Sequence, residues 1–154
     1  MILVATDGSC QALAAMRTAL ELAAHGGDRV AVVSCWQELH PTLGFPVDVE
    51  IERDWARCAA KKTSALAHEV GLEPEVSIRH GSRPGREICA AAREVDAWLI
   101  VMGCSGLSPV GGPLLGSVSA YVLQHAPCSV LVVRTDKDRM DRKRADRTTA
   151  SSAV

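Results

Sequence analysis

Three glycines and a serine in the second half of the chain have types and spacing that suit the binding of an anion. Gly103, Gly106 and Gly116 are spread over one segment, and Ser117 follows the last of them directly. Glycines leave backbone N–H groups free to approach a phosphate closely, and a helix that begins at the loop adds partial positive charge. The Ser117 hydroxyl supplies one more donor. These residues predict a phosphate-binding loop; a plain flexible connection is the alternative, although loops of this length are often functional.

Asp7, near the start of the chain, carries a carboxylate. When it is ionised, this group accepts hydrogen bonds and donates none. Such a group suits the two neighbouring hydroxyls of a ribose. Cys35 and Met102 supply apolar groups that could pack against a base. Together with the loop, these residues predict a nucleotide ligand, most simply ATP. The run Asp7-Gly8-Ser9 is also typical of a tight turn that leads into a helix, and this alternative stays open.

The elements that must position these residues follow from the alternation of short β-branched runs with longer Ala-rich segments. This alternation predicts a doubly wound α/β fold with a five-stranded parallel sheet and helices on both faces. Strands are expected at residues 2–5, 30–35, 76–78, 98–102 and 129–133. Helices are expected to run from Ser9 to Gly26, from Ile51 to Val70 before Gly71, from Pro84 to Val95, and from Ser117 to His125.

The expected strand order is 3-2-1-4-5, in which the direction of winding reverses between the first and the fourth strand. Ligands of such sheets bind beyond the carboxyl ends of the strands at the point of reversal. Asp7 follows the first strand, and Gly103 follows the fourth. We therefore expect the carboxylate and the glycine loop to flank one crevice although they lie far apart in the sequence.

Over about residues 1–134 the chain resembles the universal stress protein family. The nucleotide-binding signature of that family is G-x2-G-x9-G-[ST], which residues 103–117 match without a gap. The segments 7–9 and 126–133 are similar to the family as well. The resemblance implies an ATP-binding stress-response module with Asp7 on the ribose, Cys35 by the adenine, and the loop and Ser117 on the phosphates.

The site implied by the resemblance holds ATP, with ADP or AMP as alternatives and any Mg²⁺ held by the phosphates. Its expected residues are Ala5, Thr6, Asp7, Cys35, Met102, Gly103, Ser105, Gly106, Gly116, Ser117, Val118 and Ser119. No catalytic residue and no metal-ligating side chain is expected among them. Members of the family typically pair through their last strands, which implies a homodimer. The apolar run 130–133 at a sheet edge supports the same expectation.

Two departures from the family pattern concern the cavity. Cys35 stands where the family more often has Val, so looser packing of the adenine is expected. Residues 81–84 carry one residue more than the usual Gly-x-Pro, and Arg83 and Arg86 lie nearby. Either arginine could reach a phosphate, but a surface role is expected because the third strand lies at the sheet edge.

A binding module without turnover is predicted, with a slow ATPase or phosphotransferase as the alternative. Phosphoryl transfer calls for a lysine on the phosphates, carboxylates for a metal and a positioned base. No lysine occurs between Lys62 and Lys137, no Gly-Lys-[Ser/Thr] loop is present, and the five histidines are scattered. A response-regulator receiver is rejected because it would need paired acids near the first strand and a lysine after the fifth, where Arg134 stands.

Composition limits the number of domains, the partners and the location that we expect. The 154 residues fit one domain, and an apolar fraction of 47% is that of an ordinary globular protein. A net charge of −1 argues against binding to nucleic acid or to a membrane surface. No apolar run has the length of a signal peptide or a membrane span, so a cytoplasmic protein is expected. From residue 135 on, mixed charges without apolar periodicity predict a disordered tail, with a partner-binding arm as the alternative.

The six cysteines are expected to be reduced and mostly buried, because none forms a Cys-x-x-Cys pair and most lie in apolar runs. Cys104 is the expected exception. It lies in the glycine loop, where exposure and a nearby helix N-terminus would favour the thiolate and allow a redox role.

Overall fold

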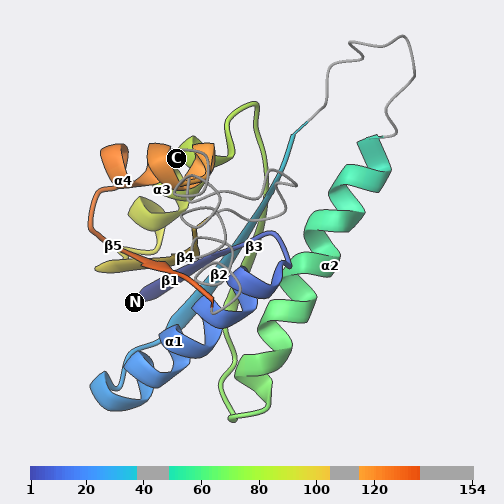
Figure 1. Cartoon of the computed structure of the whole chain (residues 1–154). Helices are drawn as coiled ribbons and strands as arrows, with labels where there is room; N and C mark the ends of the chain where they lie inside the picture. Colours follow the sequence, from blue (N-terminus) through green and yellow to red (C-terminus); the bar gives the residue numbers. More distant parts are fainter. Residues whose placement is uncertain (38–48, 105–114, 136–154) are drawn as a thin grey trace, which may run out of the picture.

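The carboxyl ends of all five strands point to the same edge of one parallel sheet. The computed structural model describes residues 1–37, 49–104 and 115–135 (Figure 1). The strands are β1 (Ile2–Thr6), β2 (Val30–Trp36), β3 (Glu75–His80), β4 (Leu99–Gly103) and β5 (Ser129–Val133). Their order is β3-β2-β1-β4-β5, and every neighbouring pair is parallel. This confirms the predicted doubly wound α/β fold and its strand order.

Four helices cover the two faces of the sheet. They are α1 (Cys10–Gly26), α2 (Val49–His68), α3 (Pro84–Glu94) and α4 (Ser117–His125). Helices α1 and α2 lie on one face, and α3 and α4 lie on the other (Figure 1). Each predicted helix is present, but α2 begins two residues before Ile51 and ends at His68 rather than Val70. Glycine at position 71 has a positive φ of 76°, and this turn ends α2 slightly earlier than its apolar pattern suggested.

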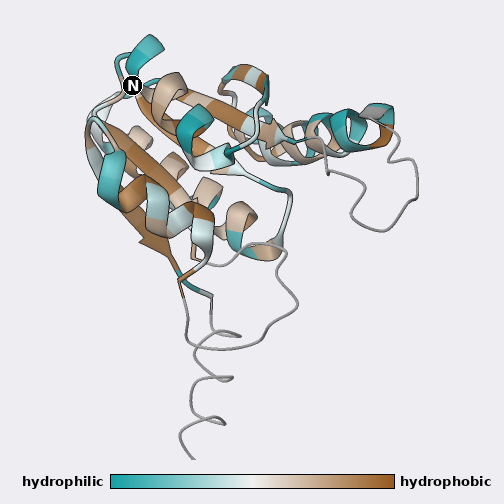
Figure 2. Ribbon diagram, turned by 90° about the horizontal axis from the view of Figure 1, so that it is seen from above, coloured by the Kyte–Doolittle hydropathy of each residue, from teal (hydrophilic) through white to brown (hydrophobic). Residues whose placement is uncertain are grey.

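Alternating side chains divide the core between the two faces of the sheet. Ile2 and Val4 of β1 pack against α1 and α2, whereas Leu3 and Ala5 pack against α3 and α4. The central strand β1 is buried along its whole length, while the edge strand β3 is partly exposed. Figure 2 shows the resulting arrangement, with apolar strands in brown between helices that carry teal, hydrophilic segments. A parallel sheet covered on both faces accounts for the nearly continuous apolar runs in the sequence.

The predicted ends of α1 are confirmed. The Ser9 hydroxyl accepts a hydrogen bond of 3.2 Å from the N–H of Ala12, as an N-cap does. Gly27 stands at the other end with a φ of 69°, in the left-handed region that favours glycine, and its N–H donates to Ala23 O. Helix α1 therefore begins immediately after the turn that contains Asp7.

The expectation of mostly buried cysteines is wrong. All six are free thiols, but only Cys89 and Cys104 are buried, while Cys10 and Cys58 are exposed. An Ala-rich helix exposes one of its faces to solvent, and the thiols at positions 10 and 58 lie on such faces of α1 and α2. The expected exposure of Cys104 is also wrong, because this residue is only 4% exposed.

The tail was predicted from residue 135 on, and its residues 136–154 lie outside the described residues. Within the ranges that the structure describes, none of the helices combines the length and the apolar character that crossing a membrane requires.

Candidate functional site

A cavity of about 310 Å³ opens at the carboxyl ends of β1, β2 and β4. Cavities of roughly 300–1,000 Å³ are typical of small-molecule sites. Every predicted site residue within the described ranges lines it: Ala5, Thr6, Asp7, Cys35, Met102, Gly103, Gly116, Ser117, Val118 and Ser119. Ser105 and Gly106 lie outside the described residues. Asp7 and Ser117 thus face one space, at the fork between β1 and β4 where a ligand was expected.

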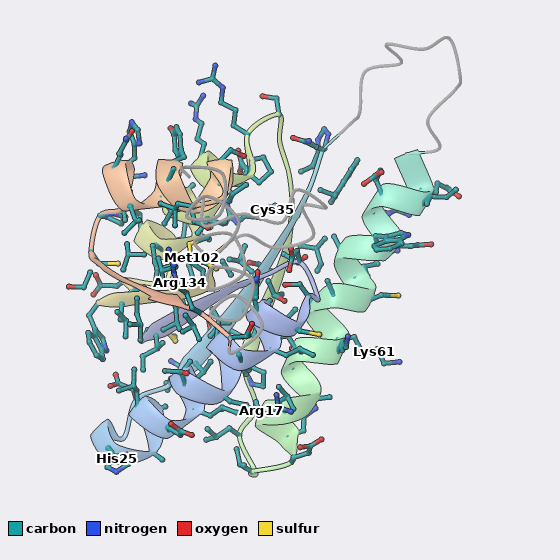
Figure 3. The ribbon with its side chains drawn as sticks, viewed as in Figure 1. Arg17, His25, Cys35, Lys61, Met102 and Arg134 are labelled. Atoms are coloured by element: carbon teal, nitrogen blue, oxygen red, sulfur yellow. The ribbon has the colours of Figure 1, made fainter. Side chains whose placement is uncertain are left out.

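The apolar part of the cavity lies between the sheet and the pair α3–α4. Cys35 and Met102 contribute to it from β2 and β4, and Figure 3 labels both side chains. Five further lining residues were not predicted from the sequence: Ser9, Ala12, Val33, Pro84 and Ile88. The sequence spacing of two of them could have indicated their place at the cavity. Val33 shares a face of β2 with Cys35 at a spacing of two, and Ile88 lies one turn after Pro84 in the helix that covers this face.

The Cys35 side chain is a neutral, packing group in this cavity. Burial raises the pKa of the thiol from 9.0 to about 12, and the negative charge of Glu87 adds to the effect, while Arg79 opposes it. The sulfur atom lies 3.8 Å from the carbonyl oxygen of Pro84, to which the thiol donates. Beside it in β2, Trp36 stacks on His80 of β3 with ring centroids 4.1 Å apart.

The polar part of the cavity includes the N-terminus of α4. The first helical hydrogen bond runs from the N–H of Ala120 to the carbonyl of Gly116, so the N–H groups of residues 117–119 have no acceptor within the helix. They supply donors for an anion at the positive end of the helix. The N–H of Gly116, expected to face a phosphate, instead donates to the carbonyl of Cys104 at 2.8 Å. This expectation is therefore corrected: the donors begin one residue later.

Ser119 fixes the start of α4 against the end of β4. Its hydroxyl lies 3.0 Å from the carbonyl oxygen of Gly103 and 3.1 Å from that of Cys104, and donates to this pair. The side chain is 3% exposed. Ser119 therefore lines the cavity as a structural contact, whereas the exposed residue Ser117 has a hydroxyl available at the helix end.

Gly103 is required by packing. A Cβ at this position would lie 2.8 Å from the Cβ of Gln11 and 3.2 Å from the backbone carbonyl carbon of the same residue. The end of β4 thus presses directly against the first turn of α1. This close approach holds the two walls of the cavity together, a role different from the expected approach of a phosphate to the glycine.

Asp7 lies in a tight turn and also faces the cavity. Its Oδ1 atom accepts a hydrogen bond of 3.0 Å from the N–H of Ser9, and Gly8 has a φ of 76°. The turn that was left open as an alternative is therefore present. It is compatible with ligand binding, because an ionised carboxylate can accept several hydrogen bonds.

Helix α2 supports this turn from the opposite face of the sheet. The Nζ atom of Lys62 donates to the carbonyl of Gly8 at 3.2 Å, so a cation lies near the site that chain order alone did not reveal. The hydroxyl of Thr6 lies 2.7 Å from that of Thr63. Because this contact directs the Thr6 side chain toward α2, its backbone is the part left to line the cavity. Arg83 and Arg86, by contrast, are exposed and do not line the cavity.

Comparison with known proteins identifies a family. A model of the universal stress protein family matches residues 1–134. A universal stress protein of Thermus aquaticus is 38% identical over 134 residues, which are 86% of this chain and 97% of the relative.

Two similar proteins of known structure hold a nucleotide. A universal stress protein from Archaeoglobus fulgidus in complex with dAMP is 29% identical, with a TM-score of 0.64 over 86% of this chain and 96% of the other. A universal stress protein in complex with cAMP is 26% identical, with a TM-score of 0.65 over 87% of this chain and 96% of the other.

Proposed function

The chain belongs to the universal stress protein family, and from that premise we propose that it is an ATP-binding regulatory module that signals through nucleotide occupancy. One observation carries the proposal: Asp7 and the N-terminus of α4 line the same cavity at the fork between β1 and β4. An acceptor for ribose hydroxyls and donors for phosphate oxygens thus face one space. The adenine nucleotides dAMP and cAMP held by two similar proteins support this choice of ligand.

Each part of the nucleotide has a proposed partner. The base packs against Cys35 and Met102 in the apolar part of the cavity. The ribose hydroxyls donate to Asp7. The phosphates accept hydrogen bonds from the N–H groups of residues 117–119 and from the loop that contains Gly106, and they hold Mg²⁺ when it is bound. Occupancy of the cavity then changes the surface offered to a partner.

The test is isothermal titration calorimetry with ATP, ADP and AMP on the wild type and on Asp7→Asn. An asparagine can still accept the hydrogen bond from the N–H of Ser9, but it offers the ribose no charge. We expect affinity to fall by about tenfold or more, since a hydrogen bond to a charged group contributes roughly 1.5–3 kcal/mol. The control is Asp28→Asn, which makes the same chemical change at another position. Asp28 accepts a hydrogen bond from the indole N–H of Trp98 and does not line the cavity, so this variant should leave affinity unchanged.

Two outcomes would change the proposal. A wild-type protein that binds no adenine nucleotide would overturn it. Steady release of phosphate from ATP, abolished by Asp7→Ala at saturating ATP, would replace it with the alternative of a slow ATPase.

We also propose that two copies pair through β5. This strand is at one edge of the sheet, and residues 130–133 are all apolar and only half-buried. An apolar edge strand offers unpaired backbone groups to a second chain.

A further inference from the structure

We propose that Thr63 of α2 is a positioning residue for the ribose end of the cavity. It does not line the cavity, and it acts by holding the turn that carries Asp7. The inference rests on the proposed function, because it assumes that the Asp7 carboxylate receives the ribose hydroxyls.

A chain of three hydrogen bonds runs from this turn to α2. The N–H of Gly8 donates to Thr6 Oγ1 at 3.0 Å. Thr6 Oγ1 lies 2.7 Å from Thr63 Oγ1. The Thr63 hydroxyl in turn lies 2.9 Å from the carbonyl oxygen of Ala59, to which it donates.

The direction of the middle bond follows from the number of protons. A hydroxyl carries a single proton. That of Thr63 goes to the carbonyl of Ala59, which has none to give, so the Thr6 hydroxyl must donate to Thr63. Thr6 then has lone pairs left for the N–H of Gly8. Every bond therefore points from the turn into α2, and each hydroxyl both donates and accepts.

Burial makes these bonds hard to replace. Thr63 is 0% exposed and Thr6 is 7% exposed, so water does not compete for their hydroxyls. Removal of the Thr63 oxygen would leave the buried Thr6 proton without its acceptor, which costs more than the loss of a bond at the surface. Packing adds a second constraint, because a Cβ at Gly8 would lie only 3.2 Å from Cα and Cβ of Ala59.

Asp7 stands between two residues that these hydrogen bonds hold in place. Its neighbours Thr6 and Gly8 are tied to α2, and its carboxylate is tied to the N–H of Ser9. The base and phosphate partners come from other elements, chiefly β2, β4 and α4. A loosened Thr63 should therefore displace the ribose acceptor while the rest of the cavity keeps its geometry.

The experiment uses calorimetry with two probes, AMP and its 2′,3′-dideoxy analogue, which has no ribose hydroxyls for Asp7 to accept. Thr63→Val keeps the shape of the side chain and removes the hydroxyl. We expect it to weaken AMP binding about fivefold or more and to change binding of the dideoxy analogue less than about twofold. Thr63→Ser restores the hydroxyl and should restore the preference for AMP.

Ser64→Ala is the matched control. Ser64 is next to Thr63 and is also buried, but its Oγ atom has no hydrogen-bond partner in the described part of the chain. Its removal should change neither affinity. Urea unfolding of each variant measures any loss of stability. Such a loss would weaken the binding of both probes equally.

Equal effects of Thr63→Val on the two probes, or no effect on either, would overturn the inference. If this variant does not fold, Thr6→Val breaks the same chain one step earlier and should show the same selective loss. A wild type that binds AMP no better than the dideoxy analogue would contradict the role of Asp7 and this inference with it. If the wild type binds neither probe, and ATP and ADP also fail to bind in calorimetry, the proposed function itself is overturned.

Discussion

Gly8 and Gly71 have the same φ of 76° but different surroundings. A Cβ at Gly71 would meet nothing within 4 Å, whereas one at Gly8 would lie 3.2 Å from Ala59. Gly71→Ala should therefore cost only the strain of the left-handed conformation, about 1–2 kcal/mol. Gly8→Ala should cost at least about 1 kcal/mol more, because α2 must move away from the turn. Urea unfolding of the two variants measures the difference, and equal losses would show that Ala59 moves without cost.

The thiols should divide into fast and slow classes toward an aromatic disulfide reagent at pH 8. Cys10 and Cys58 are exposed and should react rapidly in the folded protein. Cys35 should react only slowly, because its pKa is raised to about 12 by burial and by Glu87, and the thiolate is the reactive form. Fast modification of Cys35, detected by peptide mass mapping, would contradict the packing described above.

The same pKa shift predicts how stability depends on pH. In the unfolded chain Cys35 loses its proton near its ordinary pKa of 9.0, whereas in the folded protein it keeps the proton up to about pH 12. Its contribution to stability is therefore complete below pH 9 and is lost as the pH rises toward 12. The free energy of unfolding should fall less steeply in this range for Cys35→Val than for the wild type.

At the residue scale, the sequence predicts which residues near strand ends line the cavity. Asp7, Cys35 and Met102 could be placed there because parallel strands bring their carboxyl ends to one edge. The hydrogen bond of the Gly116 N–H could not be predicted, since its acceptor is the carbonyl of Cys104, twelve residues earlier in the chain. Ser119 was correctly placed at the cavity, but nothing in its spacing indicates that its hydroxyl donates to β4.

At the scale of elements, the hydroxyl of Ser119 holds the start of α4 against the end of β4. Ser119→Ala leaves the carbonyls of Gly103 and Cys104 without this donor. We expect unfolding free energy to fall by about 1–3 kcal/mol and nucleotide affinity to fall with it, because the donors of α4 lose their fixed position. Urea unfolding and calorimetry measure both effects. Ser129→Ala, at an exposed position of β5, should change neither.

Element types and their order could be predicted, while their ends could not be predicted to the residue. Apolar periodicity gave all five strands, including β3, whose alternation is short because an edge strand buries less of its surface. Trp98 was expected to begin the fourth strand, but β4 begins at Leu99. The indole N–H of Trp98 donates to Asp28, and its backbone N–H donates to the carbonyl of Met1, outside the ladder.

At the scale of the whole molecule, the two edges of the sheet offer a matched test of the proposed homodimer. Val130 lies in the edge strand β5, and Val76 lies in the opposite edge strand β3. A lysine introduced on β5 should prevent pairing through that edge. We therefore expect Val130→Lys to sediment as a monomer at micromolar concentration and Val76→Lys to remain dimeric, with circular dichroism as the check on folding. A wild type that sediments only as a monomer would contradict the proposal.

The stacking of Trp36 on His80 makes the protein its own optical sensor. Trp36 directly follows Cys35, which lines the cavity, whereas the indole of Trp98 donates a hydrogen bond to Asp28. With Trp55 and Trp98 replaced by phenylalanine, one fluorophore remains, and its emission should shift when a ligand enters.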